Sequence, residues 1–237
     1  MADATEVINA CRGIDADVKE AEQVLAEATA AIGAKDYKLA LEKSIEAKEK
    51  GKRAYAQRAT AIVDSSAGLL NIAKNMGVNV TEGEAALSKS RDALAKEDFP
   101  TAIDLAQKSW KKYEKIVHEH LSKSFTSAQS LIMTAKDLGK DTAAVEDLLS
   151  RARGAMESND YELALGYTNE CLETIRSELV EEVVKATTEV EVLMKTAQEM
   201  GIDIVKMSSL IDRSKADGEK QEFQKALNAL KQARAEG

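Results

Sequence analysis

This sequence contains few proline, cysteine and aromatic residues, and each shortage excludes a class of structure. Its 237 residues include one proline, two cysteines and 4% aromatic residues. The single proline, Pro100, lies in the first turn of an expected helix. It therefore does not interrupt the long helices. In an extended array Cys11 and Cys171 are too far apart for a disulfide, so a reducing compartment fits. Few aromatic residues beside abundant alanine predict thin cores between closely packed helices.

The sequence also lacks a long apolar run and a basic cluster. No stretch reaches the ~20 apolar residues that span a bilayer, and the N-terminus has no basic region followed by an apolar one. We therefore expect a cytoplasmic protein without direct membrane insertion. The net charge is −8 at pH 7, and the densest basic run, residues 108–115, contains Glu114. Because nucleic-acid binding needs clustered Lys and Arg, we expect no nucleic acid as a partner.

Residues suited to catalysis or metal binding are few and poorly placed. His118 and His120 are the only histidines. On a helix they point about 200° apart, so they cannot ligate one metal ion together. No glycine-rich phosphate loop follows a strand, and neither histidine has an evident nucleophile and orienting acid. We expect no catalytic residue, no metal and no cofactor, and therefore a protein that is not an enzyme.

What the sequence does contain is a repeat of 62 residues. Glycine recurs at this interval at Gly77, Gly139 and Gly201. An aromatic residue recurs in the same way, preceded by an acidic residue and followed three positions later by alanine; these aromatic residues are Tyr37, Phe99, Tyr161 and Phe223. A fixed period of this length is typical of repeat proteins, in which each unit buries its apolar face against its neighbours.

Each repeat predicts a short helix followed by a long one. Apolar residues at steps of three and four predict short helices at 18–33, 81–95, 143–157 and 205–219. Long helices are expected from about 36, 98 and 160 to about 76, 138 and 200. A first helix is expected over 4–12 and a last one over 222–236.

Helix ends are marked by glycines and by capping residues. The recurring glycines suit the left-handed residue that ends a long helix. Two sets of side chains are placed to cap the helices that follow: Asn79, Asp141 and Asp203 for the short helices, and Asp36, Asp98 and Asp160 for the long ones. The stretch Gly13–Ile14–Asp15 is expected to repeat the turn at Gly201–Ile202–Asp203.

The helix lengths predict how the repeats pack. A short helix covers only half of a long one, so each core should combine the end of one long helix, a short helix and the start of the next long helix. The sequence thus predicts an all-α fold of about four three-helix bundles, linked by long continuous helices into an elongated rod. The bundles are expected at residues 1–55, 56–117, 118–179 and 180–237.

This arrangement resembles the spectrin-like array of three-helix bundles, in architecture alone. Spectrin repeats are longer and characteristically carry a tryptophan in the first helix, whereas the single tryptophan here, Trp110, lies in a third segment. A second resemblance is local: residues 35–41 and 159–165 look like the turn and second helix of a tetratricopeptide repeat. That resemblance implies a groove for a peptide, although the period here is longer.

These features favour a structural role. We expect a scaffolding helical-repeat protein that acts as an elongated spacer or interaction rod, either alone or as a segment of a longer or self-assembling array. The alternative is a tetratricopeptide-like adaptor that binds a partner peptide or protein in a concave groove. Partners are expected to be proteins or further copies of the chain. Trp110 is the candidate partner-binding residue, because its position is polar in two of the four repeats and a partly exposed tryptophan is a frequent hot spot.

Overall fold

The computed structural model describes residues 1–236, and within this range the chain forms nine α-helices and no strand. The predicted all-α class is therefore confirmed. The chain divides into two compact units, Met1–Val117 and His118–Gly237. This division coincides with the boundary expected between the second and third bundles. The bundle boundaries themselves stay predictions.

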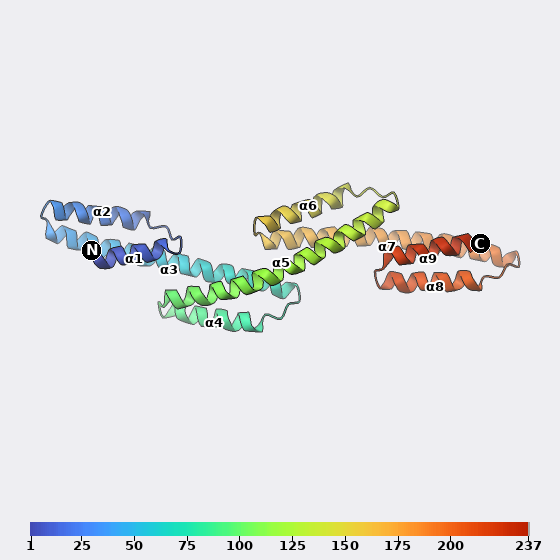
Figure 1. Ribbon diagram of the computed structural model, residues 1–237, viewed down its shortest axis with the longest axis horizontal. Helices are drawn as coiled ribbons and strands as arrows, with labels where there is room; N and C mark the ends of the chain where they lie inside the picture. The colour runs from blue at the N-terminus through green and yellow to red at the C-terminus, as the bar shows by residue number, and fades with distance from the viewer. Residues whose placement is uncertain (237) are drawn as a thin grey trace. The chain divides into compact units, whose positions relative to one another are not determined.

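Short and long helices alternate along the chain (Figure 1). The short helices have 15 residues each: α2 (Lys19–Gly33), α4 (Thr81–Ala95), α6 (Ala143–Glu157) and α8 (Val205–Glu219). The long helices have 39 residues each: α3 (Tyr37–Asn75), α5 (Phe99–Asp137) and α7 (Tyr161–Glu199). The chain begins with α1 (Ala2–Arg12) and ends with α9 (Phe223–Glu236). The predicted ranges are confirmed to within two residues.

In the first unit, α3 packs against different neighbours along its length. Helices α1 and α2 contact its first part, where Ala4, Val24 and Ala47 form a buried cluster. Helix α4 contacts α3 as well, and the start of α5 lies beside both α3 and α4. The Ser66 hydroxyl of α3, for example, donates to the Ala106 carbonyl of α5 at 3.0 Å. One long helix therefore contacts different helices along its length.

Two glycines allow close contacts between these helices. Tyr113 is buried, and its hydroxyl oxygen accepts a hydrogen bond from the Gly83 N–H at 3.1 Å. A Cβ atom at Gly83 would lie 2.5 Å from Cε2 of that ring, so only glycine leaves room for it. Gly51 plays the same part between α3 and α1, since a Cβ there would lie 3.0 Å from Val7 Cγ1. The Cys11 thiol donates to the Gly51 carbonyl at 3.2 Å.

In the second unit, α7 packs against α6, α8 and α9. Its first half is joined to α6 where the Cys171 thiol donates to the Val145 carbonyl at 3.4 Å. Ile175 lies one turn further and is fully buried. The α5 portion of this unit lies beside α6, where the Arg153 guanidinium lies 5.9 Å from the centroid of the Phe125 ring.

The turns into the long helices are closed by the predicted aspartates. Each carboxylate accepts a hydrogen bond from the backbone N–H three residues later: Asp36 at 3.0 Å, Asp98 at 3.3 Å and Asp160 at 3.2 Å. The residue before each of these has a positive φ although none is glycine; these residues are Lys35, Glu97 and Asn159, and Gln221 repeats the feature before α9. The capping prediction is confirmed.

The turns out of the long helices also agree with the prediction. Gly77, Gly139 and Gly201 have φ angles of 77°, 74° and 80°, which is the left-handed conformation expected of glycine at a helix end. The side chains of Asn79, Asp141 and Asp203 each accept from the first N–H of the following short helix, at 3.1, 3.0 and 3.0 Å. These turns leave few backbone groups unsatisfied between consecutive helices.

The turn between α1 and α2 differs from the prediction. Gly13 has φ −62°, so it does not take the left-handed conformation. Asp15 takes it instead, with φ 55°, and Asp17 accepts from the Lys19 N–H at 3.2 Å. The counterpart of the turn at residues 201–203 is therefore 15–17, and the expected Gly13–Ile14–Asp15 match was wrong. The register is set by the helix ends, and aspartate tolerates the left-handed region better than most residues.

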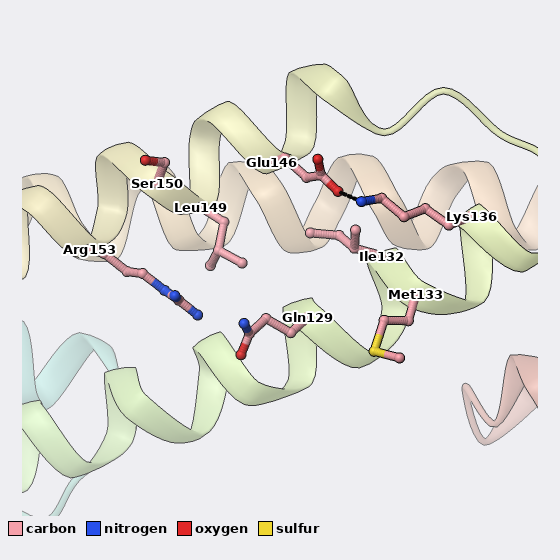
Figure 2. A pocket seen from close by; sticks show the side chains of 8 residues that line it. All are labelled: Gln129, Ile132, Met133, Lys136, Glu146, Leu149, Ser150 and Arg153. Atoms are coloured by element: carbon pink, nitrogen blue, oxygen red, sulfur yellow. Dashed lines mark ion pairs between the residues drawn. The ribbon is translucent and has the colours of Figure 1, made fainter.

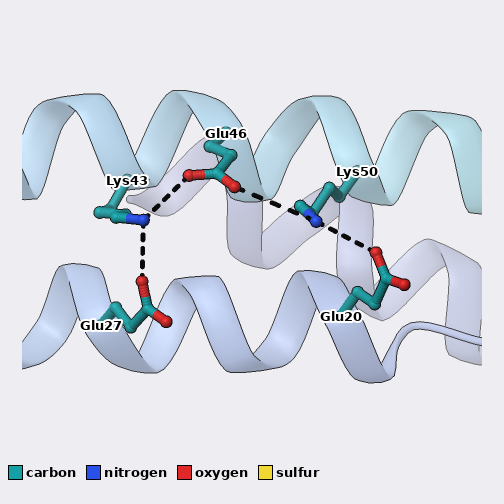
Figure 3. A network of polar contacts seen from close by, with 5 residues as sticks. All are labelled: Glu20, Glu27, Lys43, Glu46 and Lys50. Carbon is teal, nitrogen blue, oxygen red and sulfur yellow. Dashed lines mark hydrogen bonds and ion pairs between the residues drawn. The ribbon is translucent and has the colours of Figure 1, made fainter.

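Alternating charges connect α2 and α3 on their exposed side (Figure 3). The Lys43 ammonium lies 2.9 Å from Glu27 of α2 and 3.2 Å from Glu46 of its own helix. Lys50 in turn lies 3.0 Å from Glu20 and 4.0 Å from Glu46. Hydrogen bonds from Lys43 to Glu27 and then to Glu46 raise the pKa of the lysine. Exposed pairs contribute little to stability, so the apolar core beneath them holds the two helices together.

Candidate interaction surfaces

Trp110, the residue predicted to contact a partner, lies on α5 and is half-buried. The residues at the same repeat position make contacts inside the protein. Leu172 is buried, and the Lys48 ammonium lies 2.9 Å from the Asp3 carboxylate of α1. The partial exposure of Trp110 agrees with the expectation. Its contact with a partner stays a prediction.

The histidines do not form a reactive group. His118 and His120 are both exposed on α5. Across residues 1–236, no three His, Cys, Asp or Glu side chains lie close enough together to hold a metal ion. Several shifted pKa values belong to surface ion pairs instead. The hydrogen bond from Lys112, for example, lowers the pKa of the Glu82 carboxyl.

The cysteines are buried packing residues. Cys11 and Cys171 are both free thiols with no exposed surface. Burial raises the pKa of each thiol, because the thiolate would lose its hydration. A nucleophilic cysteine needs a lowered pKa and access to a substrate. Neither condition is met at these two positions.

The first exposed apolar surface is a ridge on α3 formed by Tyr37, Leu41 and Ile45. Steps of four residues place these side chains on one face of the helix. Their exposed fractions are 68%, 64% and 55%, which is unusual for three successive large apolar residues on one face. We call this surface the α3 ridge.

Counterparts of two ridge residues, Tyr37 and Leu41, are covered elsewhere in the chain. Phe99, at the position of Tyr37, is half-buried and has Tyr55 of α3 in a T-shaped contact, with the ring centroids 5.4 Å apart. Ile103 and Leu227, at the position of Leu41, are only 6% and 4% exposed. Tyr37 and Leu41 therefore stand at positions that are covered in other repeats, whereas the counterparts of Ile45 are exposed polar residues: Gln107, Asn169 and Lys231.

Helix α1 lies beside the part of α3 that follows the ridge. Its first turn contacts residues in the first part of α3. Ala4 packs in one cluster with Ala47, and the Asp3 carboxylate binds Lys48. These contacts come directly after the ridge along α3. The ridge is therefore a continuation of the α1–α3 interface.

The second apolar surface is a groove of ≈ 550 Å³ where α7 meets α8 and the start of α9. Val180 and Val184, one turn apart on α7, line it and are 47% and 59% exposed. Gly218 of α8 lies on the opposite side. The corresponding residues of the other short helices have large side chains: Ile32, Leu94 and Met156. The missing side chain opens this surface, which we call the α7 groove.

A smaller groove of ≈ 340 Å³ lies between α5 and α6 (Figure 2). Ile132 and Leu149 point into it from the two helices. Lys136 and Glu146 form an ion pair at one end, and Arg153 extends toward the other. The lining residues do not bring together a nucleophile, a base and an orienting acid, so this groove is suited to binding rather than catalysis.

Comparisons with protein-family models, with curated proteins and with solved structures gave no match to this chain. Within residues 1–236, no helix is both long enough and apolar enough to cross a bilayer. Functional inference therefore depends on the surfaces described above and on the repeated turns.

Proposed function

We propose that this protein is a scaffold made of tandem 62-residue helical repeats, which acts as an elongated spacer or protein-interaction rod. In this proposal about four three-helix bundles, similar in architecture to spectrin-like arrays, follow one another along shared helices. The protein's role is then to hold attached partners at a defined distance. Its partners are proteins or further copies of the chain.

The observation that carries the proposal is the recurrence of one hydrogen bond at the turns out of α1, α3, α5 and α7. In each case an N–H donates to the carbonyl five residues before it, at 3.0–3.1 Å; the pairs are Ala16 to Cys11, Val78 to Ala73, Lys140 to Ala135 and Ile202 to Ala197. Donors and acceptors are both spaced by 62 residues. Shared backbone geometry at this interval supports a structural repeat.

The contacts of the long helices support sharing between cores. Helix α3 contacts α1 and α2 as well as α4, and helix α7 contacts α6 as well as α8 and α9. A helix that is shared by two cores fixes the position of one core relative to the next without a flexible linker. This property suits a spacer better than an enzyme, which needs convergent groups around a cleft.

Small-angle X-ray scattering of the dilute monomer tests the proposal. Four stacked bundles of ~20 helical residues give a length on the order of 120 Å, and a thin rod of that length has a radius of gyration of about 35 Å. A compact particle of this chain length would have a radius of gyration of about 18 Å. The forward scattering gives the mass and confirms that a monomer is measured. A radius near the compact value would overturn the spacer proposal.

The second candidate function is a tetratricopeptide-like adaptor, and the α5–α6 groove is the observation that favours it. Its apolar lining residues Ile132 and Leu149 lie near the cationic Arg153, a combination suited to a peptide. Partner capture by the Trp110→Ala variant tests the proposed contact at that residue. Retention of every partner would remove Trp110 from the binding surface.

A further inference from the structure

We propose that the α3 ridge of one copy docks into the α7 groove of a second copy, so that the chains associate head to tail. This inference names the partner of the proposed scaffold and rests on that function. The two surfaces are the ridge of Tyr37, Leu41 and Ile45 and the groove lined by Val180, Val184 and Gly218.

The two surfaces are complementary in form. The ridge is a row of side chains spaced by four residues, and such rows pack into the grooves between rows on another helix. The groove offers this arrangement, because Val180 and Val184 form a row of the same spacing and Gly218 leaves the space beside it open. A Cβ atom at Gly218 would lie no closer than 3.7 Å to any neighbouring side-chain atom.

The charges around the two surfaces favour a contact between unlike surfaces. Residues 35–48, which carry the ridge, include four lysines and three acidic residues. Residues 178–191, which carry the groove, include five glutamates and one lysine. A groove-to-groove contact would bring two acidic stretches together, whereas residues 35–48 carry a net charge of +1 with Lys43 and Lys48 already paired within the chain.

A contact between unlike surfaces has a defined consequence for assembly. A docked pair keeps one free ridge and one free groove, so association continues to larger species unless a rotation closes the ring. The continuity of the ridge with the α1–α3 interface supports a helix as its cover. In this proposal α7 of the second copy supplies that helix.

Sedimentation velocity of the full chain over a wide range of concentration tests the inference. The wild type should form species that grow with concentration. Leu41→Glu blocks the ridge and Val184→Glu blocks the groove, since each would bury a charge, and each should weaken self-association by at least about tenfold. The control is Leu163→Glu, because Leu163 is 50% exposed and belongs to neither surface. This control should associate as the wild type does.

Mixing the two blocked variants gives the decisive measurement. Leu41→Glu retains an intact groove and Val184→Glu retains an intact ridge, so the equimolar mixture should form a heterodimer that grows no further. A mixture that stays monomeric, or variants that associate alone as well as the wild type, would overturn the inference. Leu41→Lys and Val184→Lys give a second pair should either glutamate variant lose helical circular dichroism.

The outcome separates this inference from the proposed function. A wild type that stays monomeric at every concentration contradicts head-to-tail docking. The elongated monomer measured by scattering would still stand in that case. A compact monomer would contradict the spacer function even if the chains associate.

Discussion

Two aspartates of one turn, Asp15 and Asp17, have opposite effects on the stability of that turn. Asp15 has φ 55°, in the left-handed region where the turns after α3, α5 and α7 have glycine. This conformation costs a non-glycine residue about 1–2 kcal/mol, and less for aspartate. Asp17 instead stabilises its turn, because its carboxylate accepts from the Lys19 N–H. Substitutions two residues apart should therefore change stability in opposite directions.

We predict that Asp15→Gly raises the free energy of unfolding by roughly 0.5 kcal/mol, since relief of the left-handed conformation exceeds the added entropy of the unfolded chain. Asp17→Ala should lower it by about 1 kcal/mol through loss of the cap. Urea denaturation followed by circular dichroism measures both changes. Effects of the same sign would contradict the assigned roles.

Residue roles were predictable from sequence where residue type and position coincide. Asp36 precedes a long helix in the usual capping position, and it caps that helix. The role of Gly83 was not predictable, because its constraint comes from the ring of Tyr113, 30 residues later. Asp15 was missed because glycine at position 13 resembles a helix stop by type, although the 62-residue interval counted back from Gly77 gives position 15.

At the scale of the element, α1 is the helix with least intrinsic stability. It has 11 residues, and isolated helices shorter than ~12–15 residues are marginal in water. Its place depends on burial of side chains such as Ile8 and Cys11 against its neighbours. Cys171 lies within the 39-residue α7, which is packed against α6 and both C-terminal helices.

We predict that Cys11 reacts with a disulfide reagent before Cys171 does. Burial raises the pKa of both thiols, so at pH 8 both react more slowly than a free thiol, and the rates rise with pH. Detachment of α1 exposes Cys11, whereas Cys171 requires opening of the α6–α7 core. The Cys11→Ala and Cys171→Ala variants assign each rate, and urea gives the fully exposed limit. Equal native rates would show that α1 is held as firmly as α7.

Helices were predictable because apolar residues recur at steps of three and four over long segments. Exposure of the α3 ridge was not predictable in the same way. Tyr37 and Tyr161 share the same repeat position and similar neighbours in sequence, yet they are 68% and 4% exposed. The difference depends on which distant segments cover each tyrosine, and local sequence near Tyr37 does not contain this information. The α7 groove was missed since it arises from Gly218 across from α7.

At the scale of the whole molecule, the proposal places each core across the end of one long helix and the start of the next. Two deletions of equal length test this placement. Removal of residues 118–179 joins Val117 to Val180 and keeps Gly83 with Tyr113. Removal of residues 99–160 preserves the same repeat phase but brings Ile175 to the place of Tyr113, opposite Gly83.

We predict that the chain lacking residues 99–160 is less stable than the chain lacking residues 118–179, by about 2–4 kcal/mol. Isoleucine leaves a cavity beside Gly83, and the Gly83 N–H loses the hydroxyl that accepts its hydrogen bond. Urea denaturation of both chains under the same conditions measures the difference. Equal stabilities would place the core boundaries elsewhere.

One buried pair of repeat positions is filled differently in each of three cores. The pairs are Ala21 with Gly51, Gly83 with Tyr113, and Val145 with Ile175. Neighbouring repeats of one chain are prone to misassembly, since a short helix emerging during folding meets several similar long helices. A short helix docked on the wrong long helix would meet either a clash or a void at this position. We expect this unequal division of volume to favour docking of each short helix on its own partner as the chain folds.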